Sequence, residues 1–247
     1  MSYDKTGMIT FITKVMEKLK GKWIAAISSS VILAFLVFVV SDLVKLFPAV
    51  GIPVIGFIFL GEIAFMRRLL SGANYQLEDL FQYYKLFIPA FLTTAIFIIL
   101  VSVGLAFLIV PGIYLLVTYS FALFILEENP TIGSLQAFHK SKEFTKGYRN
   151  RIAIFYLIFF VISALVFGIS LAISLLPNLI WGTNLLLIAG MIAGAIETVF
   201  ICPLFFASLT AFYDELKNGS FPKSVKGKAK EELKKEEDIE VVQAEEI

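Results

Sequence analysis

The chain has very few of the residues on which most catalytic and metal-binding sites depend. Its 247 residues include one cysteine, Cys202, and one histidine, His139. A single cysteine excludes a disulfide framework within the chain, and its apolar surroundings predict a small buried side chain. His139 falls on a predicted surface helix, where a lone histidine is usually solvated. No HExxH, CxxC, GxSxG or P-loop pattern occurs, so we predict no metal, no cofactor and no catalytic residue.

Charge is also scarce. Charged residues make up 17% of the chain and hydrophobic residues 58%, with 25 phenylalanines, whereas a soluble domain carries about 25% charged residues. The net charge is +1 and the basic residues are spread along the chain, so no nucleic-acid partner is expected. Residues 1–22 carry charges throughout, and the apolar run that starts at Trp23 is longer than the core of a signal peptide. No cleavable signal peptide is therefore expected.

Long uncharged runs are what the chain has instead. Residues 86–126 form a run of 41 uncharged residues and residues 152–196 a run of 45, each about twice the 20 residues that span a bilayer. Each run therefore predicts two membrane helices. Two more are predicted at Trp23–Ser41, extending to about Phe47, and at 54–70. The expected fold is all-α, a polytopic membrane protein with six transmembrane helices in three hairpins.

The turns of these hairpins are predicted from proline, glycine and asparagine. The three predicted connections lie at residues 48–53, 102–112 and 177–182. Within the second, the turn is either at Pro111-Gly112 or near Gly104, with Pro111 then inside the following helix. The third connection divides the last pair into helices at about 152–176 and 184–212.

The positions of lysine and arginine predict the orientation. Twenty of the 21 basic residues fall in four segments, residues 1–22, 67–85, 140–151 and 217–235. Loops rich in Lys and Arg stay on the cytoplasmic side of a membrane. We therefore expect a multi-pass protein of the cell (cytoplasmic) membrane with both termini in the cytoplasm.

Three of the basic segments also show helical apolar periodicity. They are residues 8–20, residues 76–88 and a stretch that starts at Asn129-Pro130, and they predict amphipathic helices on the inner leaflet. The expected division of the chain is an N-terminal amphipathic helix (1–22), a membrane domain (23–216) and a charged, mostly disordered tail (217–247).

Two glutamates inside apolar segments are the candidate functional residues, because ionisable groups in a membrane are costly. Glu197 lies in line with two glycines on the sixth predicted helix, and Pro203 follows it. The carboxyl either binds a cation, carries a proton or holds a polar lipid headgroup beside a proline bend, or it is a protonated glutamic acid hydrogen-bonded to Ser or Thr across a helix interface. The small residues expected to pack the fifth helix against the sixth are Gly190, Gly194, Ala164, Gly168 and Ala172.

Glu62, the second intramembrane candidate, lies five residues before Arg67. That spacing is about 8 Å along a helix, close enough to the boundary for water or a snorkelling arginine to reach, and a structural role is the simpler interpretation. The acidic pair Glu127-Glu128 ends the fourth helix. It is expected either to attract a cation or to pair with Lys140 or Arg149.

The stretch PGIYLLVTYSFALFILEENPTIGSLQAFHKSKEFTKGYRNR resembles a group of prokaryotic six-helix membrane proteins. The group includes the membrane domain of some glycerophosphodiester phosphodiesterases. The matching elements are Pro111-Gly112, Tyr119, Phe121, Glu127-Glu128, Ala137, Ser141 and Lys146-Gly147. Two further stretches, GEIAFMRRLLSGANYQLEDLF and PLFFASLTAFYDELKNG, are also similar, so the resemblance spans about residues 55–220. It implies an integral membrane module and transfers no catalytic residue.

Three functions follow from these patterns. The first is a non-enzymatic membrane module that organises lipids or a partner protein at the cytoplasmic face. The second is a small transporter or channel that uses Glu197, with Pro203 and a possible threefold repeat of hairpin and basic segment in support. The third is a lipid-modifying membrane enzyme in which Glu62 or Glu197 acts as acid or base. The oligomeric state stays open.

Overall fold

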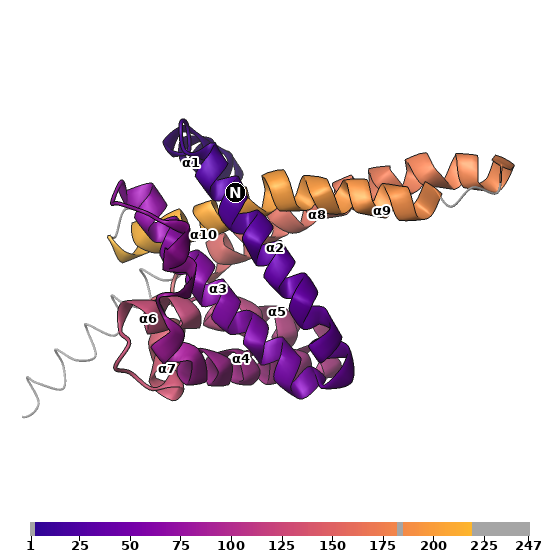
Figure 1. The fold of residues 1–247 in the computed structure, drawn as a ribbon. Coiled ribbons are helices and arrows are strands. Elements are labelled where there is room, and N and C mark those ends of the chain that lie inside the picture. The colour runs from indigo at the N-terminus through magenta and orange to yellow at the C-terminus, as the bar shows by residue number, and fades with distance from the viewer. Residues whose placement is uncertain (1–2, 182–184, 219–247) are drawn as a thin grey trace, which may run out of the picture.

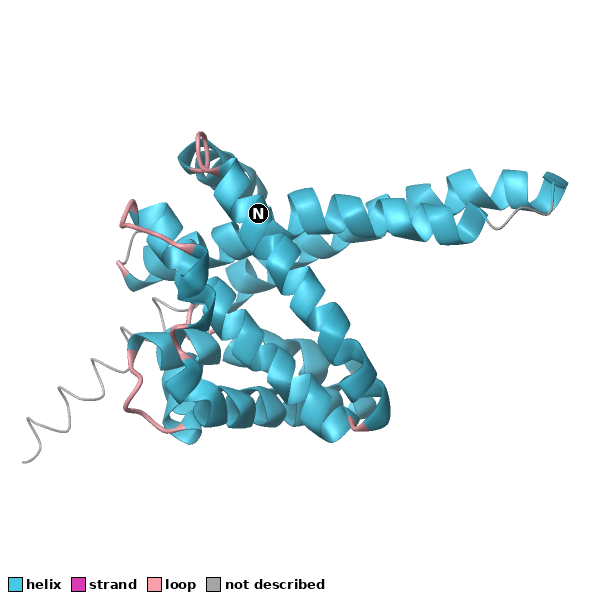
Figure 2. Cartoon of the chain, in the orientation of Figure 1, coloured by secondary structure: helices cyan, strands magenta, loops and turns pink. Residues whose placement is uncertain are grey.

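The computed structural model describes residues 3–181 and 185–218, and every regular element in these two ranges is helical (Figures 1 and 2). The α-helices are α1 (Tyr3–Lys18), α2 (Trp23–Leu46), α3 (Pro48–Ser71), α4 (Phe87–Phe107), α5 (Ile109–Tyr119), α6 (Ala122–Glu128), α7 (Ser134–Phe144), α8 (Arg149–Trp181), α9 (Leu185–Ile196) and α10 (Cys202–Lys217). Two short 3₁₀ helices, η1 (Leu77–Phe81) and η2 (Tyr84–Leu86), precede α4, and a π-helical turn, η3 (Glu197–Ile201), joins α9 to α10.

In the described residues, five helical segments are long and apolar enough to cross a membrane, as expected of a multi-pass membrane protein. They are Trp23–Leu46, Leu77–Phe107, Ile109–Glu128, Arg149–Ala172 and Gly190–Lys217. α3 is not among them, and its last three turns contain Glu62, Arg67 and Arg68. An all-helical architecture is the expected solution in lipid, because a helix satisfies its own backbone hydrogen bonds.

The first predicted turn is shorter than expected. α2 packs along α3, and the two helices are separated only by Phe47. The predicted connection at 48–53 is wrong, because Pro48 is the first residue of α3 and Pro53 lies inside that helix. Proline is well tolerated in the first turn of a helix, whose N–H groups have no partner within the helix.

The turn between α4 and α5 lies within its predicted range, at Leu108, between the two predicted sites. Leu108 alone separates the helices, with an extended backbone, and Pro111 is the third residue of α5, inside the following helix as the second alternative expected. The two helices pack side by side, and a methyl group on Gly104 would come within 3.0 Å of the Cα of Gly112. The two glycines therefore allow the close approach of the backbones directly beside the turn.

α8 and α9 form the third pair and project away from the other helices (Figure 1). The predicted break at 177–182 is wrong for residues 177–181, since α8 continues to Trp181. The predicted sixth helix, 184–212, is helical throughout its described part, which starts at Leu185 and continues to Lys217. The π-helical turn η3 interrupts the α-helical hydrogen bonding between α9 and α10, and α10 begins one residue before Pro203.

The predicted surface helices differ most from the structure. α1 buries Met8, Phe11 and Val15 within the protein, packed against α10 and α8, and Leu19 directly after the helix is buried too. These side chains are not available to a leaflet, whereas Ile9 and Met16 are exposed. Residues 76–88 form η1, η2 and the start of α4 rather than one helix, and α7 starts at Ser134 rather than at Pro130. Residues 219–247, most of the predicted tail, lie outside the described residues.

Aromatic rings dominate the core where α1, α6, α8 and α10 meet. Phe212 of α10 stacks on Phe155 of α8, with ring centroids 5.5 Å apart, and meets Phe11 of α1 edge to face at 5.7 Å. Phe121 and Phe124 lie 5.3 and 5.1 Å from the ring of Tyr213. These contacts hold α10 in place next to the polar cluster described below.

Candidate functional site

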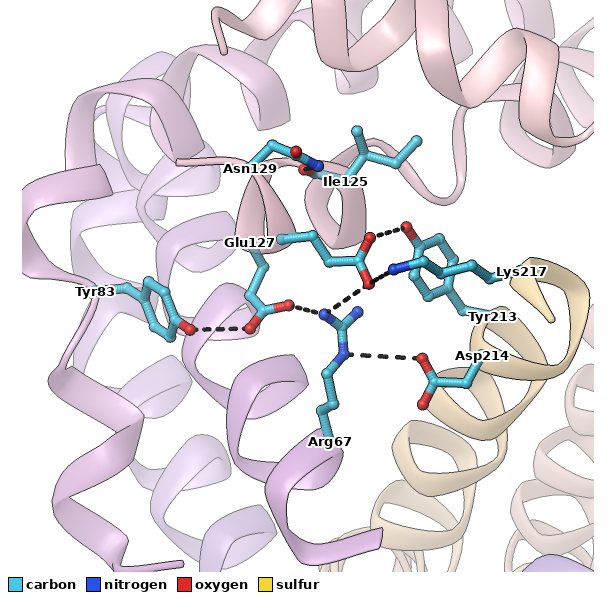
Figure 3. A network of polar contacts seen from close by, with 9 residues as sticks. Arg67, Tyr83, Ile125, Glu127, Asn129, Tyr213, Asp214 and Lys217 are labelled. Carbon is cyan, nitrogen blue, oxygen red and sulfur yellow. Dashed lines mark hydrogen bonds and ion pairs between the residues drawn. The ribbon is translucent and has the colours of Figure 1, made fainter. Parts of the chain in front are cut away.

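A polar cluster lies where α3, α6 and α10 end (Figure 3). Arg67 is at its centre and forms an ion pair with Glu127, a 3.2 Å contact with Glu128 and a 3.9 Å contact with Asp214. The guanidinium fork suits several carboxylates at once. We call this group the Arg67 cluster, and its members are Arg67, Tyr83, Glu127, Glu128, Tyr213, Asp214 and Lys217.

Both glutamates of α6 have further partners in the Arg67 cluster. Tyr83 donates its hydroxyl hydrogen to Glu127 at 2.9 Å. Glu128 accepts hydrogen bonds from the Tyr213 hydroxyl at 2.9 Å and from Lys217 Nζ at 2.8 Å. The side chains of Glu127 and Glu128 are only 7% and 18% exposed, and carboxylates at that depth are tolerated when they are paired and hydrogen-bonded.

The partners predicted for this acidic pair are wrong. Lys140 and Arg149 do not take part in the contacts of the Arg67 cluster, and the guanidinium of Arg149 lies 4.8 Å from the ring centroid of Tyr114 instead. Sequence proximity favoured these two cations. The true cationic partners, Arg67 and Lys217, are 60 and 89 residues away from the glutamates they contact, a relation that no local spacing reveals.

A second polar connection lies beside the first. Arg68 forms an ion pair with Asp79 of η1 at 2.6 Å and a hydrogen bond with Gln82. The backbone approaches closely at the same place, because a methyl group on Gly61 of α3 would overlap the carbonyl oxygen of Leu80. η1 is thus held against α3 by charge and by close packing together.

Glu62 is completely buried between α2 and α3. Its Oε1 accepts a hydrogen bond from Ser29 Oγ at 3.0 Å, while Oε2 has no hydrogen-bond partner among the described residues. The arginine that was expected to reach it, Arg67, is bound in the cluster with Glu127. Glu62 therefore has the surroundings of a structural polar group in a helix interface.

Glu197 is the first residue of the π-helical turn η3. Its Oε2 accepts a hydrogen bond from Ser163 Oγ of α8 at 3.2 Å, so the carboxyl faces the neighbouring helix as expected. The amide of Cys202 donates to the Glu197 carbonyl, five residues back, which widens the helix just before Pro203. Single π-helical turns of this kind occur frequently at functional sites.

The small residues near Glu197 do not form the expected interface. A methyl group on Gly168, Gly190 or Gly194 would meet no described residue within 4 Å, and Ala164 and Ala172 are exposed. α8 and α9 do pack along each other, but these five residues face outward. A four-residue spacing identifies a shared helix face and does not say which neighbour that face meets.

An apolar cavity of about 220 Å³ lies between α3, α4 and the α5–α6 junction. Its walls include Ile55, Gly56, Thr93, Thr94, Phe97 and Ala122. The hydroxyls of Thr93 and Thr94 are buried and have no hydrogen-bond partner in the described structure. Sequence reasoning missed this site, although adjacent threonines in a run of apolar residues were a visible signal.

The other chemistry of the described residues is limited. No group of three or more His, Cys, Asp and Glu side chains in residues 3–181 and 185–218 has an arrangement that could hold a metal ion. Comparison of the chain with protein-family models, curated proteins and solved structures finds no match. The resemblance to the membrane domain of glycerophosphodiester phosphodiesterases therefore stays a prediction, and the function must be argued from the geometry of these sites.

Proposed function

We propose that the protein is a six-pass, non-enzymatic membrane module that holds a glycerolipid in the cavity beside Thr93 and Thr94. The six passes are the two-helix pairs α2–α3, α4–α5/α6 and α8–α9/α10. The packing of each pair supports this topology, although α3 carries three charged residues near its end. Basic residues at the ends of α3, α7 and α10, and at the start of α8, support the cytoplasmic assignment of that side and of both termini.

The unpartnered hydroxyls of Thr93 and Thr94 carry the proposal of a bound lipid. A buried hydroxyl without a hydrogen bond is costly, and the cavity wall around this pair is otherwise mostly apolar. Thr93 lies six residues into α4, about 9 Å along the helix from Phe87. Both hydroxyls are covered by neighbouring atoms in this structure, so the threonine side chains change rotamer when the lipid binds. An oxygen of the lipid glycerol backbone then accepts their hydrogen bonds, and one acyl chain occupies the cavity.

Lipid retention after purification tests this proposal. Protein purified in a mild detergent is examined by native mass spectrometry, and bound lipid is quantified after extraction. Thr93→Val combined with Thr94→Val removes both hydroxyls with little change in shape, and Ala122→Leu fills the cavity. A hydrogen bond between groups in a membrane contributes about 0.6 kcal/mol or more, so loss of two lowers the affinity for lipid at least about eightfold.

Thr210→Val is the matched control for these variants. Thr210 is also buried, and its hydroxyl also has no partner among the described residues, but it does not line this cavity. The control is expected to retain lipid at the level of the unmodified protein. Undiminished retention by both cavity variants, with unchanged thermal stability, would refute the acyl-chain site. A specific protein that copurifies in place of lipid would favour a partner-protein module.

A second candidate function is transport through a path that includes Glu197. The π-helical turn and the hydrogen bond from Ser163 favour it, because an intramembrane carboxyl at a distorted helix is a common feature of ion and proton paths. Flux of ions and small solutes into proteoliposomes, compared between the protein and Glu197→Gln, tests it. Flux that does not change on substitution removes Glu197 from any transport mechanism. The lipid-modifying enzyme stays a prediction.

A further inference from the structure

A second cavity, of about 340 Å³ and largely open to the surface, lies between α8, η3 and α10. That volume falls within the range of about 300–1,000 Å³ for small-molecule sites. The side chains that matter for its chemistry are Tyr156, Phe159, Phe160, Ser163, Glu197 and Phe205. The cavity shares no residue with the one beside Thr93 and Thr94.

Glu197 supplies the charge of this cavity. It is half-buried, and its hydrogen bond from Ser163 Oγ, at 3.2 Å, comes from a neutral donor. Among the described residues, no lysine, arginine or histidine forms an ion pair with Glu197. A carboxylate in apolar surroundings gains much from a countercharge. No described cationic side chain takes the position of a countercharge next to Glu197.

Aromatic rings supply most of the remaining wall. Phe159 meets Phe205 edge to face, with centroids 5.2 Å apart, and Tyr156 lies 6.0 Å from Phe205. Phe160 stands at the rim with 70% of its surface exposed. The face of an aromatic ring attracts a cation within about 6 Å of its centroid, most strongly where water is excluded.

We infer that this cavity binds a lipophilic organic cation, of the quaternary ammonium or phosphonium class. The carboxylate of Glu197 neutralises the charge, while the rings of Tyr156, Phe159 and Phe205 contact its apolar substituents. An inorganic cation fits less well, because Ca²⁺ takes about six to eight oxygen ligands and this wall offers mainly one carboxylate and one serine hydroxyl. An organic cation instead uses both properties of the wall, its single negative charge and its aromatic surface.

Binding of tetraphenylphosphonium to the full-length protein in mild detergent, measured by equilibrium dialysis, tests the inference. Glu197→Gln keeps the size of the side chain and removes its charge, and it is expected to weaken binding at least tenfold. Glu197→Asp keeps the charge and is expected to retain most of the affinity. Phe205→Leu removes one ring, and a contribution of about 0.5–2 kcal/mol from cation–π attraction corresponds to a loss of about 2- to 30-fold.

Two controls separate this site from simple partition into apolar surfaces. Triphenylphosphine oxide presents similar phenyl groups without net charge and is expected to bind without dependence on residue 197. Glu62→Gln removes the other intramembrane carboxyl, which lies outside this cavity, and is expected to leave tetraphenylphosphonium binding unchanged. Equal affinity of the protein and folded Glu197→Gln would overturn the inference, as would equal weakening by Glu62→Gln.

The organic-cation site does not depend on the lipid proposal. The two cavities have different walls, so Thr93→Val with Thr94→Val is expected to leave tetraphenylphosphonium binding intact. Loss of one binding activity without the other identifies which proposal fails. Binding also needs no transport, because dialysis measures occupancy alone.

Discussion

Replacing Arg67 by methionine tests whether the Arg67 cluster holds the helix ends together. The change keeps most of the aliphatic stem and removes the guanidinium. It deletes a charge-assisted hydrogen bond to Glu127, the 3.2 Å contact with Glu128 and the position over the ring of Tyr213, 5.4 Å from its centroid. Two adjacent carboxylates then face each other with less positive charge between them.

The size of the loss in unfolding free energy follows from the partners that Glu127 and Glu128 retain after Arg67 is replaced. Among the described residues, Glu128 keeps Lys217 at 2.8 Å and Tyr213 at 2.9 Å, whereas Glu127 keeps only Tyr83. Removing one partner of a buried ion pair costs about 3–5 kcal/mol. Because the Arg67 side chain is 20% exposed, solvent screens part of the loss. We expect a free energy of unfolding lower by about 3 kcal/mol.

Denaturation in mixed detergent micelles, followed by circular dichroism, measures this loss. Arg68→Met is the matched control on the next residue, since its guanidinium pairs with Asp79 but is 37% exposed. A pair so exposed contributes about 1 kcal/mol or less. Adding Glu127→Gln to Arg67→Met removes the carboxylate charge that has lost its arginine, and it is expected to recover about 1–2 kcal/mol of unfolding free energy. Equal costs for the two methionine variants, or no recovery in the double variant, would refute this account.

Two further predictions concern packing. Gly61→Ala places a methyl group against the backbone of η1 and is expected to lower the free energy of unfolding by about 1–3 kcal/mol. Gly168→Ala adds a methyl group in open space and is expected to be neutral or slightly stabilising. The same denaturation assay compares the two variants. Phe11→Ala removes a buried ring between α1 and α10, at a cost of about 3–5 kcal/mol, and is expected to speed amide hydrogen exchange throughout α1. Ile9→Ala, on the exposed face of the same helix, is expected to change neither quantity, and equal exchange in both variants would contradict the docking of α1.

The class of protein was predictable because it follows from how hydropathy and charge are distributed along the sequence. Uncharged runs of 41 and 45 residues are each long enough for two membrane helices, and a helix satisfies its own backbone N–H and C=O groups where the bilayer offers no partner. The hydrogen bond across the interface at Glu197 was among the predicted alternatives, because a membrane carboxyl next to another helix needs a donor. Helix ends were less predictable, as Pro48 and Trp181 illustrate. Proline is accepted at a helix start, and an apolar helix continues past weak breaking signals.

The sequence alone determined an all-helical, multi-pass membrane protein with its basic residues grouped in four segments. Only the tertiary structure decided that Arg67 pairs with Glu127 rather than with Glu62, that α1 is docked, and that the glycines near Glu197 face outward. The reason is the range of the interactions involved. Hydropathy and helical period act within about 20 residues. The Arg67–Glu127 and Lys217–Glu128 contacts of the Arg67 cluster instead join residues 60 and 89 positions apart and depend on how the helices cross.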